Sequence, residues 1–242
     1  MIGRVHRLLR FLVLLALAVT GALLLYALGK SRPQDLPWTP FDLSQPIGLF
    51  TGQKLAGLTD DRAQCHALLK RAGVQYSAVP DRPGEQCGYA DAVRLRPNAQ
   101  QIGYRPADVA PSCPVVAALK LWEWDVVQPA ALEYFGQGVR AIEHFGSYNC
   151  RRLYGRETGP FSEHATADAI DIAGFILEDG TRIRVLQDWK GGGAGAAFLH
   201  AVRDGACDLF STTLSPDYNR AHADHLHFDQ AERGALGASV CR

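Results

Sequence analysis

Three of the eight histidines in the chain lie within six residues, at His222, His225 and His227. If this segment is extended, its side chains alternate between two faces, so that His225, His227 and Asp229 share one face. Histidine nitrogens bind transition metals and transfer protons near neutral pH, so this face could hold a metal ion. Most isolated His-x-His pairs lie in solvated loops, and the cluster alone leaves that interpretation open.

A second set of candidate ligands lies between Ser162 and Asp171. His164 is predicted in a loop and Asp171 inside an apolar run, so a bend between them lets both side chains point to one place. A carboxylate in an apolar strand is costly to bury unless a cation or hydrogen bonds offset its desolvation. Asp171 is therefore the better ligand candidate, whereas Asp168 is interpreted as an ordinary loop carboxylate.

These residue types together indicate a zinc site. Two histidines and one carboxylate leave one position of a tetrahedral zinc ion open for water, as hydrolytic zinc sites require. His164, Asp171 and one C-terminal histidine satisfy this count, and the other histidines are then free to transfer protons. The His-Glu-x-x-His helix signature of other zinc peptidases is absent, which predicts a different zinc architecture.

The strands that must position these residues are predicted from alternating hydrophobicity. Apolar runs at 169–177 and 181–185 flank the turn sequence Glu178-Asp179-Gly180, a pattern that predicts a β-hairpin. Alternation along the first run places Asp171 on one face, with isoleucines packed behind it. A further strand is predicted at 139–145. The region 51–105 carries no recognisable chemistry.

Apolar residues at helical spacing and helix-end signals predict helices at 62–72, 114–124, 129–135 and 196–203. Trp122 and Trp124 could form a sugar-binding platform, but aromatic residues at helical spacing are more often core residues. The glycine-rich run at 191–195 lacks the Gly-Lys-Ser/Thr ending of a phosphate loop and is interpreted as a flexible loop. The elements together predict an α+β fold, in which a small antiparallel sheet carries the zinc site and helices flank it.

The N-terminal region predicts export. Residues 11–29 form an apolar run of 19 residues with one threonine, which at 1.5 Å per residue spans about 28 Å. Basic residues precede this run in excess, so the N-terminus is expected to stay cytoplasmic. Ala27-Leu28-Gly29 is a passable cleavage site, but the run exceeds the core of an ordinary signal peptide. We expect an uncleaved anchor at 1–29, a proline-rich linker at 30–50 and an exported domain at 51–242.

Charge and cysteine content agree with an exported globular protein. The formal net charge of the chain is zero, and 47% of its residues are hydrophobic. Residues 30–242 carry 22 basic against 25 acidic residues, so no attraction to nucleic acid is expected. No pattern indicates an oligomeric state. The six cysteines form no C-x-x-C pair, which favours three disulfides over a thiolate metal site. Order along the chain suggests the pairs Cys65–Cys87, Cys113–Cys150 and Cys207–Cys241.

Two motifs resemble known families. The pattern Ser162-x-His164-x-x-Ala167-x-Ala169-x-Asp171, followed by His222-x-x-His225-x-His227, resembles the paired motif of the zinc D-alanyl-D-alanine carboxypeptidases and penicillin-insensitive murein endopeptidases. The segments 146–151 and 162–165 and the ending Cys241-Arg242 resemble more closely the bacterial extensin-like C-terminal domain family, over about 65–242. The chain has none of the Ser-Pro repeats of a structural extensin.

The resemblance implies a role for each motif residue. It implies zinc ligation by His164, Asp171 and His227. His225 would act as the general base for the attacking water, and His222 would assist it or hold the oxyanion.

Arg151 matches an arginine that stabilises charge on the attacked carbonyl, with Arg152 as the alternative. Ser162 would orient the loop of His164.

Two departures from the peptidase pattern matter. The pattern usually has glycine where this chain has Ala167. Some relatives use a glutamate base three residues before the last ligand, where this chain has Asp224. A shorter carboxylate on the opposite face of the strand would reach the site poorly, so His225 is preferred as the base.

The expected protein is a single-pass protein of the inner membrane with a periplasmic metallopeptidase domain. It would hydrolyse stem peptides or cross-links of peptidoglycan. One alternative is a cell-wall-binding module that zinc stabilises without turnover. Another is an amidase for a different exported amide, which spacing alone does not separate from a peptidase because both need the same groups.

Overall fold

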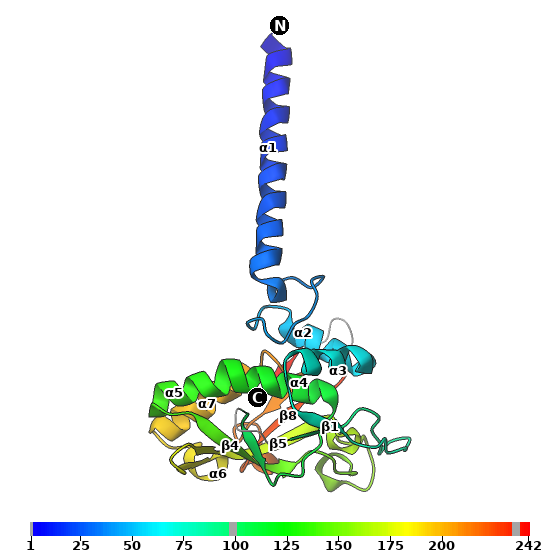
Figure 1. Ribbon diagram of the computed structural model, residues 1–242, viewed down its shortest axis with the longest axis vertical. Helices are drawn as coiled ribbons and strands as arrows, with labels where there is room; N and C mark the ends of the chain where they lie inside the picture. Colours follow the sequence, from blue (N-terminus) through cyan, green and yellow to red (C-terminus); the bar gives the residue numbers. More distant parts are fainter. Residues whose placement is uncertain (1, 97–100, 234–237) are drawn as a thin grey trace.

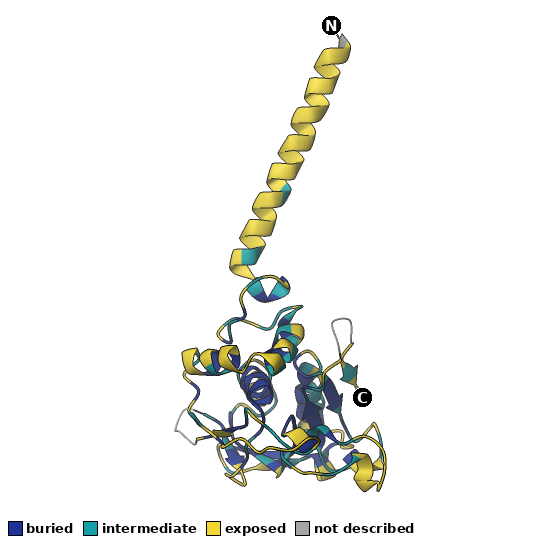
Figure 2. Ribbon diagram, turned by 90° about the vertical axis from the view of Figure 1, so that its right-hand side faces the viewer, coloured by how far each residue is buried: buried dark blue, intermediate teal, exposed yellow. Residues whose placement is uncertain are grey.

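The computed structural model describes residues 2–96, 101–233 and 238–242. A long helix, α1 (Ile2–Ser31), stands away from a body of mixed helices and strands (Figure 1). Nearly all of α1 is exposed along its length (Figure 2). The stretch Gly3–Ser31 is long and apolar enough to cross a membrane. Its length and position fit either a single-pass anchor or a signal sequence.

The proline-rich segment after α1 packs onto the body. It contains the short helix η1 (Pro33–Asp35), and further along Phe41 and Leu43 are buried in the main core. The Lys54 ammonium donates hydrogen bonds to the Pro33 carbonyl at 3.0 Å and to the Gln34 side chain at 3.2 Å. Apolar residues between the prolines therefore hold this segment against the domain rather than leaving it as a free tether.

The helices follow the sequence signals, with one correction. Asp61 caps α3 by accepting a hydrogen bond from the Gln64 amide, and Gly136 ends α5 with a φ of 67°. The predicted helices at 114–124 and 129–135 are joined by a π-helical turn, and the first is buried on every side rather than amphipathic. The helices are α2 (Thr51–Ala56), η2 (Gly57–Asp60), α3 (Arg62–Arg71), α4 (Cys113–Trp122), η3 (Glu123–Val127), α5 (Gln128–Phe135), α6 (Val185–Asp188) and α7 (Ala194–Ala206).

The main sheet has seven strands and is mixed, so it is larger than the small antiparallel sheet predicted. Its order is β3-β4-β5-β8-β7-β9, and β6 pairs with β5 as the predicted hairpin. The pairs β3–β4 and β7–β9 are parallel. Their outer strands have three and two residues, too few to show a period in the sequence. The strands are β3 (Gly103–Arg105), β4 (Val139–Gly146), β5 (Ala169–Leu177), β6 (Arg182–Arg184), β7 (Thr212–Leu214), β8 (Leu226–Asp229) and β9 (Val240–Cys241). A separate pair joins β1 (Tyr76–Ala78) to β2 (Val93–Leu95).

Helices α4, α5 and α7 cover one face of the main sheet (Figure 1). The Trp122 ring packs edge-on against Phe228 at 5.1 Å between centroids, and its indole N–H donates to the Val202 carbonyl at 2.7 Å. Phe198 of α7 meets Phe175 of β5 at 5.0 Å. Trp122 is therefore a core residue, as the helical spacing predicts. The face of the sheet away from these helices carries polar side chains, among them Asp171 and His227.

Three disulfides tie the body together, and two of the predicted pairings are wrong. The bonds join Cys65 to Cys113, Cys87 to Cys150 and Cys207 to Cys241. Only the last pair follows order along the chain. Cys65 instead bonds to Cys113 because α3 packs against the start of α4.

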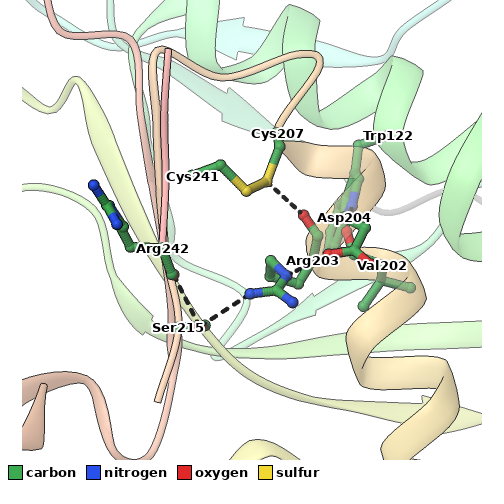
Figure 3. The surroundings of a disulfide bond; sticks show 8 residues. All are labelled: Trp122, Val202, Arg203, Asp204, Cys207, Ser215, Cys241 and Arg242. Carbon is green, nitrogen blue, oxygen red and sulfur yellow. Dashed lines mark hydrogen bonds and ion pairs between the residues drawn. A yellow bond between two sulfur atoms is a disulfide. The ribbon is translucent and has the colours of Figure 1, made fainter. Parts of the chain in front are cut away.

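The confirmed bond holds the C-terminal strand. Cys207 follows α7 and Cys241 lies in β9, beside the Ser215 hydroxyl that donates to the Arg242 carbonyl at 2.9 Å (Figure 3).

Candidate metal and catalytic site

Two of the predicted ligands are cross-strand neighbours. The register of β5 and β8 places Asp171 opposite His227, and alternation turns both side chains away from the helical layer. Their nearest atoms, Asp171 Oδ1 and His227 Nδ1, are 2.9 Å apart. The adjacent strand residues Ile170, Ile172 and Phe228 point to the opposite, helical side and are fully buried. The alternation predicted from sequence for both strands is confirmed.

The third predicted ligand comes from the turn before β5. His164 lies in the short helix η5 (Glu163–Thr166), where the Ser162 hydroxyl accepts a hydrogen bond from the His164 amide at 3.4 Å. His164 Nδ1 lies 2.6 Å from the Ser147 carbonyl oxygen. A carbonyl only accepts, so Nδ1 carries a proton and Nε2 is the ring nitrogen that a metal would bind. Nε2 is 3.2 Å from both Asp171 Oδ1 and His227 Nδ1.

The donor set fits a zinc ion. One imidazole Nε2, one imidazole Nδ1 and one carboxylate oxygen converge, at separations of 2.9 to 3.2 Å. Bonds of roughly 2.0–2.1 Å to a tetrahedral zinc ion would set such donors about 3.3 Å apart. All three side chains are buried. In the described part of the chain, these are the residues whose ligand atoms lie close enough together to hold one metal ion. Small adjustments of these atoms would admit the metal.

Electrostatics hold this cluster together without an ion. Burial raises the pKa of Asp171, but the hydrogen bonds from His164 and His227 outweigh it and hold that pKa well below its usual range. Burial lowers the pKa of His227, yet the two flanking carboxylates of Asp171 and Asp229 raise it to about 9. His227 is therefore protonated on both ring nitrogens, and each N–H group faces one carboxylate. A cation bound at Nδ1 would replace the proton on that nitrogen.

Strand alternation placed Asp229 on the face of His225 and His227 but assigned it no role of its own. Its Oδ2 lies 3.0 Å from His227 Nε2, the ring nitrogen on the side away from the other donors. A carboxylate behind a metal-binding histidine fixes the ring orientation and strengthens the ligand. The available signal was the spacing, because residues two apart in β8 share a face.

His225 lies beside the donor cluster without joining it. Its Nε2 is 3.5 Å from Asp171 Oδ1, and its Nδ1 is 2.8 Å from Asp224 Oδ1. The Asp224 carboxylate therefore accepts a hydrogen bond from the Nδ1–H group of His225, which leaves the Nε2 lone pair turned to the site. Asp224 lies outside the donor cluster, but in the turn between η6 (Arg220–His222) and β8 rather than on the opposite face of a strand, as predicted.

His222 lies on the outer side of the same cluster. The centroid of its ring lies 5.2 Å from the centroid of the His225 ring and 5.9 Å from that of the His227 ring. Burial and the neighbouring histidines lower its pKa to about 4, so it is neutral at pH 7. Its Nδ1–H group donates a hydrogen bond to Asn219 Oδ1 at 2.9 Å.

The two candidate arginines have different surroundings. Arg151 lines the cavity of about 490 Å³ that contains the donor cluster. Arg152 instead donates to the Gly159 carbonyl and stacks over the Phe161 ring at 4.3 Å. Of the two, Arg151 is the one whose position allows contact with a molecule in the cavity.

Asp168 is not the solvated loop carboxylate predicted. It is buried, and the Ser112 hydroxyl donates to its Oδ1 at 2.5 Å. Burial is the main cause that raises the pKa of Asp168, to about 8. The Gln230 amide also donates to its backbone carbonyl at 3.1 Å. Asp168 thus helps to fix the turn between the candidate ligands His164 and Asp171.

Comparison with known proteins identifies one family. The family described as Extensin-like protein C-terminus matches residues 63–242. A search of curated proteins gave no match, and a search of solved structures gave none either. The match covers every residue of the donor cluster and its neighbours. The likeness to zinc peptidases rests on the motif residues alone.

Proposed function

The chain belongs to the family of extensin-like C-terminal domains, and from this premise we propose that it is a zinc-dependent hydrolase of peptidoglycan peptides. One observation carries the proposal. Three unlike donor atoms, from His164, Asp171 and His227, converge within 3.2 Å in the wall of an open cavity. An oriented histidine with a free ring nitrogen lies beside them.

Zinc would be held by His164 Nε2, Asp171 Oδ1 and His227 Nδ1, the three converging atoms. When bound, it would polarise a carbonyl and make water more acidic. The Ser147 carbonyl and the Asp229 carboxylate support the two imidazoles from behind.

The chain's own groups would handle the protons and the developing charge. His225 Nε2 would accept a proton from the attacking water and return it to the leaving amine, while Asp224 stabilises the imidazolium formed. His222 is neutral, and its Nδ1 proton is directed to Asn219. Its free Nε2 therefore suits accepting a hydrogen bond, which favours the assisting role over the oxyanion role. Arg151 would stabilise negative charge on the attacked carbonyl.

The expected location and the resemblance together support the substrate class. An apolar N-terminal helix and three disulfides fit a protein of the oxidising space outside the cytoplasm. The motif residues resemble those of peptidases that cleave murein peptides. Peptide amides of the wall are the substrates that satisfy both observations.

The test is digestion of purified sacculi by the full chain in detergent, loaded with zinc. New peptides are expected by mass spectrometry, lost with a chelator and restored by added zinc. His225→Ala should stop product formation while keeping bound zinc, and His200→Ala, a histidine stacked on Trp189 away from the site, should behave as the unchanged chain. Turnover that resists chelation would contradict the zinc mechanism. Binding to sacculi without new peptides would favour the wall-binding module instead.

A further inference from the structure

A second pocket lies beside the candidate site on the same face of the sheet. Its volume is about 360 Å³, and residues of β3, β4, β5 and α6 contribute to its lining. Each of the two cavities alone falls in the size range of ordinary ligand sites. Neither the donor cluster nor the proton-handling histidines line the second pocket.

The two pockets are neighbours along one strand. Asp171 lines the first and Ala173 lines the second. Residues two apart in a strand share a face and lie roughly 7 Å from each other. The pockets therefore lie next to each other along β5, on either side of the boundary between Asp171 and Ala173.

His225 marks the boundary between the pockets. Its ring lines the first pocket and packs edge-on against Phe145, at 5.8 Å between centroids. Phe145 lines the second pocket, as does Asp224, which orients His225. The candidate catalytic group thus stands in the middle of a groove rather than at its closed end.

The second pocket is lined by three apolar and six polar residues, and one of its cations is unmatched. Phe145 and Leu186 are 61% and 64% exposed. Glu143 is held by Arg182 at 3.1 Å and by Arg184 at 3.5 Å.

Arg105, on β3, also lines this pocket, and it has no ion pair or side-chain hydrogen bond with any residue the structure describes. This chemistry fits an aliphatic peptide segment that carries a free carboxylate.

We propose that the groove binds a peptide on both sides of the scissile amide, so that the protein is an endopeptidase for cross-linked stem peptides. This inference rests on the proposed function. Removal of one terminal residue would use a small closed pocket, whereas both pockets here hold more than one residue. The step is hydrolysis: the C–N bond breaks, the water oxygen joins the carbonyl carbon, and its proton passes to the leaving amine.

The test compares a purified cross-linked muropeptide dimer with an uncross-linked pentapeptide monomer, using the zinc-loaded full chain. We expect cleavage of the cross-link at least tenfold faster, as kcat/KM, than release of D-alanine from the monomer. Arg105→Glu should lower kcat/KM for the dimer about tenfold, mainly through KM, since a charge-assisted contact is lost. The loss for the monomer should be several-fold smaller.

Arg140→Glu is the matched control, because Arg140 is an exposed arginine of β4 that lines neither pocket. It should leave both rates unchanged. Faster release of D-alanine from the monomer, or an equal loss on both peptides with Arg105→Glu, would overturn the endopeptidase assignment alone. Absence of cleavage of either peptide by the unchanged chain would contradict the proposed function itself.

Discussion

The three C-terminal histidines differ because each has a different partner. His227 lies between two carboxylates, whereas His225 meets one carboxylate and His222 an amide oxygen. Alternation along β8 predicted that His225 and His227 share a face. It did not predict the partners, because Asn219 reaches back to His222 through a turn whose shape depends on the surrounding fold.

Replacing Asp224 with asparagine should slow turnover without loss of zinc. The change removes the carboxylate charge that holds the Nδ1 hydrogen bond of His225, so kcat should fall about 10–100-fold. Sacculus digestion and zinc content measure the two effects. An unchanged rate would contradict the orienting role of Asp224.

Asp168 should make the stability of the domain depend on pH. Its folded pKa of about 8 exceeds the unfolded value of 3.8, so the folded state binds more protons between these values. The free energy of unfolding should therefore fall as the pH rises from about 4 to 8, by an amount on the order of a few kcal/mol. Asp168→Asn should raise the melting temperature more at pH 8 than at pH 5. An equal change at both pH values would argue against this source.

The turn between the candidate ligands His164 and Asp171 shows why glycine suits the position that Ala167 occupies. His164 lies in η5, and Ala167 follows with φ 61° and ψ 15°. This left-handed conformation favours glycine, which the peptidase pattern has at this position. The turn reverses the chain so that β5 begins at Ala169 and presents Asp171 to His164.

Substitutions at Ala167 should separate strain from packing. Ala167→Gly relieves about 1 kcal/mol of strain but loses a buried methyl worth about 0.8 kcal/mol, so stability should barely change. Ala167→Val should lower the free energy of unfolding by at least about 2 kcal/mol, because a branched side chain is strained there and the site is fully buried. Urea unfolding of both variants measures this, and a valine variant as stable as the unchanged chain would contradict it.

Elements with strong local signals were predictable, and elements defined by distant partners were not. The β5–β6 hairpin carries a turn sequence between apolar runs, and Asp61 and Gly136 mark helix ends. The parallel strands β3 and β9 exist only through pairing with distant segments.

The same reasoning applies to side chains. Residue types placed His164 and Asp171 together with one C-terminal histidine, and the resemblance singled out His227. The burial of Asp168 depends on Ser112, which lies 56 residues away. The disulfides Cys65–Cys113 and Cys87–Cys150 likewise follow from packing.

The arrangement of the whole molecule separates the anchor from the groove. α1 leads into α2, which packs against α4, and α4 covers one face of the sheet (Figure 1). The donor cluster lies on the other face. If α1 spans the membrane, the groove opens on the side of the sheet away from the bilayer, which suits a substrate in the wall.

Loss of the Cys207–Cys241 bond should destabilise the molecule and weaken the site together. The bond closes a separation of 34 residues, and its removal should lower the free energy of unfolding by about 2–4 kcal/mol. Val240 of β9 lines the first cavity, so the double variant Cys207→Ser/Cys241→Ser should also lose turnover at temperatures well below its melting point. Urea unfolding and sacculus digestion of the purified variant measure the two effects. Unchanged stability would show that β9 is held without the disulfide.

The central claim is that His164, Asp171 and His227 bind one metal ion and that His225 does not. The most direct measurement is the zinc content per chain after loading and removal of free metal. We expect about one zinc ion in the unchanged chain and in His225→Ala, and almost none in His227→Ala. Absence of zinc from the unchanged chain, or equal zinc in His227→Ala, would contradict the claim.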